Sequence, residues 1–269
     1  MKKRKLFLGA TLATAIFAQS MTAFAATATN DPDKDGSDAH TTIGIMEAKT
    51  NPGQASFEVP LYIVAAAVKN ENDLVCPTGY DIKNTGAASI GVTKMSVEKL
   101  TTGASGWAML ANGTTPTAAK QMTFSIGDIN LPALNDTTLK ADVDIKNSKN
   151  MFYDNTASWG SGNTGKYLEI PAGKTLSESI LTRAGKNIAT ASEQDLTSLK
   201  LVKTKVNGTD RAVESSLLLA GKVDGTKITA DVKATPQFKV TYTVSALDEN
   251  GQPIGNTYVG DNKAAAFPN

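Results

Sequence analysis

Histidine and cysteine are almost absent from this chain of 269 residues. The only histidine is His40 and the only cysteine is Cys76. A Ser-His-Asp or Cys-His catalytic arrangement needs a positioned imidazole, and a zinc site needs several Cys or His ligands. A single cysteine also excludes a disulfide within the chain. The sequence therefore predicts neither a serine, cysteine or zinc enzyme nor a disulfide-stabilised domain.

Nucleotide-binding motifs and a strong net charge are missing as well. No glycine-rich phosphate loop of either common type is present. The 27 basic and 26 acidic residues nearly balance, which gives no electrostatic reason to bind nucleic acid. Carboxylate pairs stay open, because glycoside hydrolysis depends on their separation in the fold and not on sequence spacing. We expect a protein that is not an enzyme and has no cofactor, with a hidden carboxylate hydrolase as the alternative.

The N-terminus carries the most extended apolar run, from Leu6 to Ala18. Lysines and an arginine precede this run at residues 2–5, and Ala23-Phe24-Ala25 follows it. A basic start, an apolar stretch of about 7–15 residues and a small-x-small end are typical of a secretory signal peptide. A membrane-spanning helix needs about 20 apolar residues, so a retained anchor is the less favoured alternative. We predict that residues 1–25 are a signal peptide, and that the protein is secreted to the extracellular space or cell surface with no membrane span after cleavage.

Residues 26–41 are polar and lack periodicity, which predicts a flexible acidic N-terminal arm. Inside the arm, acids at alternating positions and a glycine resemble the start of a calcium loop. The candidate ligands are Asp31, Asp33, Asp35 and Asp38. The twelfth position of such a loop is Thr42, where a bidentate glutamate is expected. A solvated acidic linker is therefore favoured over a calcium site.

From residue 42 onward, short runs rich in β-branched and aromatic residues alternate with turn residues, which is typical of strands. Asn250-Gly251 between two alternating segments is a strong hairpin signal. The predicted strands lie at 57–64, 80–83, 90–97, 122–126, 139–145, 167–170, 199–206, 217–223, 227–232, 238–245 and 254–259. Leu176–Ile188 and Glu193–Leu199, the second capped by Ser192, are the only candidate helices.

Many short strands separated by turns point to a sandwich or barrel. We predict that residues 42–269 form an all-β domain, a β-sandwich of jelly-roll or immunoglobulin-like type. At most one or two short helices are expected, with room for insertions.

Trp159 is the one ligand candidate outside the arm. It lies in a Gly-, Ser- and Asn-rich loop at 155–165, where an exposed ring could stack on a sugar. The alternative is a tryptophan folded back onto the sandwich. Trp107 is predicted to be in the core. Cys76 is interpreted as a buried, small apolar side chain, with intermolecular pairing or a reactive thiol as the alternative.

Two short patches carry a family resemblance. Asp81-Ile82-Lys83-Asn84-Thr85-Gly86 and Ile170-Pro171-Ala172-Gly173-Lys174-Thr175 resemble TasA/camelysin-type surface or matrix proteins of Gram-positive bacteria. The resemblance implies a single jelly-roll-like domain behind a lysine-headed signal, with a matrix, fibre or surface-coat role. No catalytic residue carries over. The signal, the Thr-rich linker and Tyr242-Thr243-Val244-Ser245 also resemble WxL-type cell-wall proteins, although the Trp-x-Leu motif is not intact because Met109 stands two positions after Trp107.

These observations lead to two main hypotheses. In the first, the protein is a structural subunit that self-associates when its free arm, Ala26–Met46, pairs with the sheet edge of a neighbour. The β-prone end of the arm at Thr41–Ile45 motivates this idea. In the second, the protein is an adhesion module that binds cell-wall polysaccharide or host glycan through Trp159.

Overall fold

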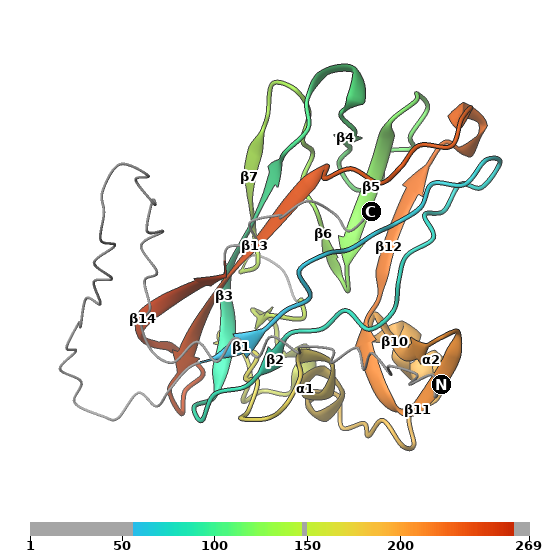
Figure 1. Cartoon of the computed structure of the whole chain (residues 1–269). Helices are drawn as coiled ribbons and strands as arrows, with labels where there is room; N and C mark the ends of the chain where they lie inside the picture. Colours follow the sequence, from blue (N-terminus) through green and yellow to red (C-terminus); the bar gives the residue numbers. More distant parts are fainter. Residues whose placement is uncertain (1–55, 147–149, 261–269) are drawn as a thin grey trace, which may run out of the picture. The chain divides into compact units, whose positions relative to one another are not determined.

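The computed structural model describes residues 56–146 and 150–260 of the chain (Figure 1). All of them belong to one unit of the chain. The predicted signal peptide, the acidic arm with its calcium candidates, and His40 lie outside the described residues.

Two sheets of four strands each form most of the domain. Figure 1 shows the first sheet on the left and the second on the right. The first has the order β14 (Pro253–Gly260), β13 (Phe238–Leu247), β3 (Ile90–Lys99) and β7 (Lys140–Val143). The second has the order β12 (Leu219–Val223), β5 (Gln121–Ile126) and β4 (Ala108–Met109), and β6 (Ile129–Asn130) also pairs with β5. Neighbouring strands are antiparallel except for β4 and β5.

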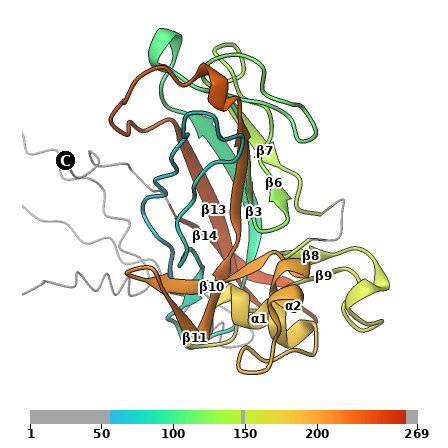
Figure 2. The same ribbon diagram turned by 90° about the vertical axis from the view of Figure 1, so that its right-hand side faces the viewer.

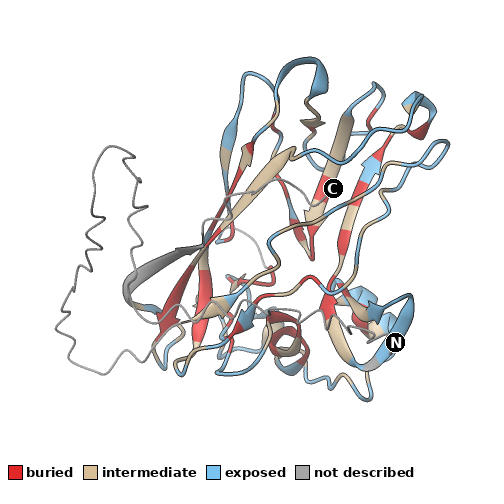
Figure 3. Ribbon diagram, in the orientation of Figure 1, coloured by how far each residue is buried: buried red, intermediate tan, exposed pale blue. Residues whose placement is uncertain are grey.

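One hydrophobic core draws side chains from both sheets. Met95 of β3 and Tyr242 of β13 are buried together with Ile126 of β5 and Leu219 of β12. Figure 3 shows buried positions recurring along these strands. Burying one large apolar side chain contributes roughly 1.5–3 kcal/mol, so this shared core holds the two sheets together. The prediction of an all-β domain is confirmed.

Smaller elements gather at one end of the large sheets, as Figures 1 and 2 show. Three two-stranded pairs are present: β1 (Phe57–Glu58) with β2 (Lys83–Asn84), β8 (Tyr153–Asp154) with β9 (Lys166–Tyr167), and β10 (Leu201–Val206) with β11 (Thr209–Leu217). Single 3-10 turns lie at Gly103–Ser105, Ala157–Trp159 and Gly225–Lys227.

The two short helices are where the sequence predicts them, α1 at Leu176–Arg183 and α2 at Glu193–Ser198. Each begins with a capping box, in which the first side chain and the one three residues later satisfy each other's backbone amides. Ser192 caps α2 as predicted. Within the described residues, no helix combines the length and the apolar character that a membrane crossing requires.

Several predicted strands differ from the structure. The predictions 80–83 and 167–170 shrink to Lys83–Asn84 and Lys166–Tyr167, and two others differ more. At 227–232 no strand forms. The first residue of this stretch ends a 3-10 turn, Gly225–Lys227, in which the side chain of Asp224 accepts a hydrogen bond from the amide of Thr226. In the predicted strand 57–64, only Phe57 and Glu58 pair with another strand, β2. By contrast, the hairpin around Asn250-Gly251 is confirmed, with Leu247 opposite Pro253.

Candidate functional site

The outer edge of the second sheet is an irregular hairpin that follows β1. Its returning limb lies along β12, where the amide of Leu74 donates to the carbonyl of Gly221 over 2.9 Å. Its outgoing limb, Val59–Val68, meets the returning limb where Ala66 and Val75 exchange two hydrogen bonds of 2.9 Å. We call Val59–Val68 the edge segment. Figure 1 shows the chain running from β1 toward β12 and returning to β2.

The edge segment is apolar on its outer side as well as its inner side. Val59 and Ile63 pack against the hydrophobic core. Leu61 and Val64 are 62% and 53% exposed, and Val68 is exposed as well. The backbone amides of Leu61, Ile63 and Val64 form no hydrogen bond with the backbone of another described residue. An apolar sheet edge without a neighbouring strand is a template for pairing with another chain.

The edge of the first sheet at β7 is protected in the usual way. This strand has only four residues, and its exposed positions are Lys140 and Asp142. Asp142 forms an ion pair of 3.0 Å with Lys94 of β3. A short strand with charged side chains resists pairing with other chains. The edge segment lacks this protection.

A groove of about 650 Å³, lined by apolar and charged side chains, lies beside α1. Its other walls come from the stretch between Tyr167 and Pro171, the chain after α1, and the turn at Gly251. Its basic lining residues are Lys166, Lys174, Arg183 and Lys186. Its acidic lining residues are Glu169, Glu178 and Glu249. Because the two signs nearly cancel, the groove carries little net charge.

Arg183 is held in a fixed position at this groove. One terminal nitrogen donates to the carbonyl oxygens of Asn150 (3.2 Å) and Met151 (3.4 Å). The guanidinium lies 4.4 Å from the centroid of the Trp159 ring, which is a cation–π contact. Burial lowers the pKa of Arg183 to about 10, although the negative charge of Asp154 opposes this change. Arg183 is therefore charged at neutral pH and rigidly placed.

Trp159, the ligand candidate from the sequence, is half-buried in the 3-10 turn at 157–159. Its amide donates to Asp154 over 3.3 Å, and Arg183 covers one face of its ring. Trp159 is not one of the residues that line the groove, whereas Asn163 and Arg183 are. The placement corresponds to the alternative interpretation, a tryptophan folded back onto the domain.

The two patches that carry the family resemblance meet beside the groove. The backbone amide of Asn84 donates to the carbonyl of Lys174 over 2.9 Å, and the backbone amide of Gly173 donates to the carbonyl of Asn84 over 3.0 Å. The Nδ2 atom of Asn84, which is fully buried, donates to Ile170 over 2.8 Å. The patches therefore form one junction that fixes the stretch before α1.

Asp81, in the same junction, holds the start of α1. Its carboxylate accepts hydrogen bonds from both the hydroxyl and the amide of Ser177. Burial raises the pKa of Asp81 to about 6, and the hydrogen bonds from Ser177 and Ile82 oppose this rise. No imidazole is nearby among the described residues. The contact between Asp81 and Ser177 therefore connects the chain before β2 to the start of α1.

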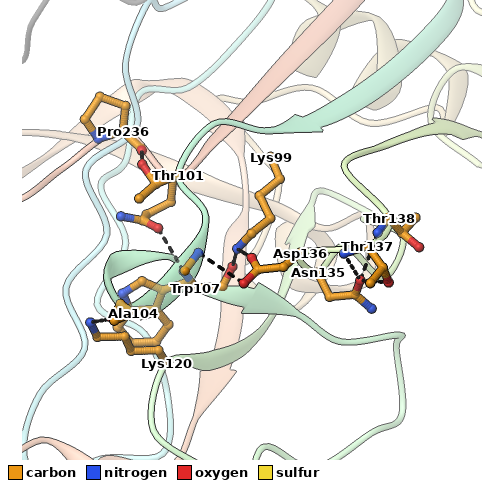
Figure 4. A network of polar contacts seen from close by, with 12 residues as sticks. Lys99, Thr101, Ala104, Trp107, Lys120, Asn135, Asp136, Thr137, Thr138 and Pro236 are labelled. Carbon is orange, nitrogen blue, oxygen red and sulfur yellow. Dashed lines mark hydrogen bonds and ion pairs between the residues drawn. The ribbon is translucent and has the colours of Figure 1, made fainter.

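A buried lysine forms a second polar network at the other end of the sandwich (Figure 4). The side chain of Lys99 is only 1% exposed, and its amine donates to the carbonyl of Trp107 and lies 3.5 Å from Asp136. Asp136 also accepts from the amide of Gly103 over 3.1 Å. Trp107 itself is half-buried and lies outside the hydrophobic core, which corrects the prediction that it belongs there. Its backbone groups are used to hold the loops instead.

Cys76 is half-buried and packs against the hydrophobic core. Burial raises the pKa of its thiol to about 11, so the unreactive protonated form dominates at neutral pH. This environment fits the interpretation of Cys76 as a small apolar side chain. Among the described residues, no group of three His, Cys, Asp or Glu side chains could hold a metal ion.

Sequence reasoning did not find the groove or its fixed arginine. The only signal in the sequence is the capping pattern at Thr175 and Glu178, which marks the start of a helix but not its neighbours. Comparison of the chain with protein-family models, with curated proteins and with solved structures finds no match.

Proposed function

We propose that this protein is an exported structural subunit of an extracellular matrix, fibre or surface coat, and that it assembles through contacts at β-sheet edges. The edge segment is the observation that supports this role. It has the composition of a strand, it exposes Leu61 and Val64, and no described strand pairs with Leu61, Ile63 or Val64. Extended chains commonly bind by adding a strand to such an edge.

In this proposal the added strand comes from the arm of a second copy, residues 26–46. The arm ends in the β-prone stretch Thr41–Ile45, which has the right chemistry to pair with an apolar edge. Covering Leu61 and Val64 would contribute roughly 1–2 kcal/mol for each side chain, in addition to the backbone hydrogen bonds. The residues expected to form a signal peptide would direct the chain out of the cell, and the role is structural rather than catalytic. It agrees with the role that the TasA/camelysin resemblance implies.

The test compares the assembly of four forms of the chain that begin at Ala26. They are the wild type, the double variant Leu61→Lys/Val64→Lys, a deletion of residues 26–46, and the control Val213→Lys. Val213 lies on β11 and is 69% exposed, so the control adds a charge at an equally exposed apolar site elsewhere. Size-exclusion chromatography with light scattering and negative-stain microscopy measure the assemblies.

We expect fibres or large oligomers from the wild type and the control, and only small species from the edge variant and the deletion. Charged residues at a sheet edge block pairing without disturbing the core. A wild type that stays monomeric at high concentration contradicts the proposal. So does an edge variant that assembles as the wild type does.

A carbohydrate-binding role is the second candidate, and the groove beside α1 is the observation that favours it.

A further inference from the structure

We infer that the groove beside α1 is a binding site for a short neutral oligosaccharide. The volume of about 650 Å³ is within the usual range for small-molecule sites, roughly 300–1,000 Å³. The inference goes beyond the proposed assembly role, because the groove and the edge segment share no residue.

The charge pattern of the lining selects the class of ligand. An anionic ligand would meet the carboxylates of Glu169, Glu178 and Glu249, and a cationic one would meet the four basic side chains. A neutral polyol avoids both conflicts. Sugar hydroxyls donate and accept hydrogen bonds, so they match a lining that combines ammonium and carboxylate groups with the amides of Asn163 and Asn187.

Two lining side chains have polar atoms that the protein leaves without a partner. The Oγ atom of Ser179 and the Nε atom of Arg183 are both buried and form no hydrogen bond within the described residues. Ser179 is 6% exposed and stands one helical turn before Arg183 on the same face of α1. A buried polar group without a partner costs about 1–3 kcal/mol, and native proteins contain few of them. Both residues line the groove, and a ligand hydroxyl that reaches these atoms would supply the missing partner.

The walls of the groove are rigid enough to act as a preformed site. Arg183 is fixed by two backbone carbonyls and by the ring of Trp159. Trp159 is thus a positioning residue in this inference and does not itself touch the sugar. Asp81 and Asn84 hold the start of α1 and the stretch at Ile170 in place. Preorganised walls lower the entropic cost of binding.

The test is an array of oligosaccharides followed by isothermal titration calorimetry of any hits, with the chain that begins at Ala26. The array carries neutral hexose oligomers, neutral N-acetylglucosamine oligomers of the cell-wall type, uronic acid oligomers and free amino-sugar oligomers. The hexose and N-acetylglucosamine oligomers are both neutral, and comparing them distinguishes a host glycan from a cell-wall glycan as the ligand. The blocking variant is Thr182→Trp, since Thr182 is an exposed lining residue on α1. The matched control is Thr197→Trp, an exposed threonine on α2 that does not line the groove.

We expect at least one neutral oligomer to bind the wild type and the control, and to bind the blocking variant at least tenfold more weakly. The double variant Lys166→Ala/Glu249→Ala is a second probe, because neither side chain forms a hydrogen bond or ion pair within the described residues. It should also bind at least tenfold more weakly, and it keeps the test decisive if the tryptophan variant misfolds. The inference is overturned by the absence of binding to any neutral oligomer, by binding to charged oligomers alone, or by binding that survives in a folded blocking variant.

Discussion

Replacing Asn84 with alanine is the sharpest test of the junction that holds the groove and the first sheet together. Asn84 is fully buried, and its side chain forms three hydrogen bonds. Its Nδ2 atom donates to the carbonyls of Ala88 (2.7 Å) and Ile170 (2.8 Å). Its Oδ1 atom accepts from the amide of Gly86 over 2.9 Å.

The loss in the free energy of unfolding caused by Asn84→Ala depends on which hydrogen bonds the partners of Asn84 keep. The carbonyl of Ile170 still accepts from Ile90, and the amide of Gly86 still donates to Ser56, so both keep a partner. The carbonyl of Ala88 loses the side-chain donor that the structure gives it. Three lost hydrogen bonds at about 1 kcal/mol each, plus a small void, predict a loss of about 3–4 kcal/mol in the free energy of unfolding.

Urea unfolding followed by circular dichroism measures this loss, and the slope with denaturant should stay the same if the fold is kept. Asn84→Asp is the matched variant, because it preserves the shape but faces two carbonyls with a carboxylate. Asn84→Asp should be at least as destabilised as Asn84→Ala at neutral pH, and its free energy of unfolding should partly recover on acidification. Asn112→Ala, at an exposed turn, should change stability by less than about 0.5 kcal/mol. If Asn84→Ala costs less than 1 kcal/mol, the junction does not depend on this side chain.

Two further predictions concern titratable groups. The pKa of Asp81 in the folded state, about 6, exceeds the ordinary value of 3.8, so the folded state binds this proton more tightly than the unfolded state does. The contribution of protonated Asp81 to the free energy of unfolding is therefore lost as pH rises through 6. Between about pH 5 and pH 7.5 the wild type should therefore lose up to about 1.4 kcal/mol relative to Asp81→Asn in urea unfolding, and parallel pH profiles for the two proteins would refute this. For Cys76, with a thiol pKa near 11, modification by a thiol reagent at about pH 8 should be at least a hundredfold slower in the native protein than in denaturant. Equal rates would show that the thiol is not shielded.

Local signals in the sequence predicted the elements that depend on local chemistry. The side chain of Ser192 caps the helix that follows it, and the Asn250-Gly251 turn joins the two strands beside it. Both signals depend only on nearby residues, so they can be recognised without the rest of the fold. The alternating run at 238–245 likewise became the central strand β13. Next to the missing strand at 227–232, Asp224 likewise acts on its own neighbours, because it caps a 3-10 turn that includes Lys227.

The groove could not be predicted, because it depends on contacts between distant parts of the chain. Arg183 is positioned by carbonyls at Asn150 and Met151, more than thirty residues earlier. Nothing near Arg183 in the sequence indicates these partners. The junction at Asn84 is a partial exception, since the sequence singled out both of its patches through a family resemblance. Only the structure shows that the two patches contact each other.

The predicted strand 57–64 fails for a different reason from the one at 227–232, and the difference supports the assembly proposal. Most of 227–232 is exposed and its first residue belongs to a 3-10 turn, whereas the chain after Glu58 keeps Val59 and Ile63 against the core. Its composition is that of a strand, and what it lacks within the described residues is a neighbouring strand. Pro60, which has no amide proton, suits an edge position rather than the middle of a sheet. Composition can specify an extended apolar edge, but its pairing depends on a second strand, which in the proposed assembly comes from another copy of the chain.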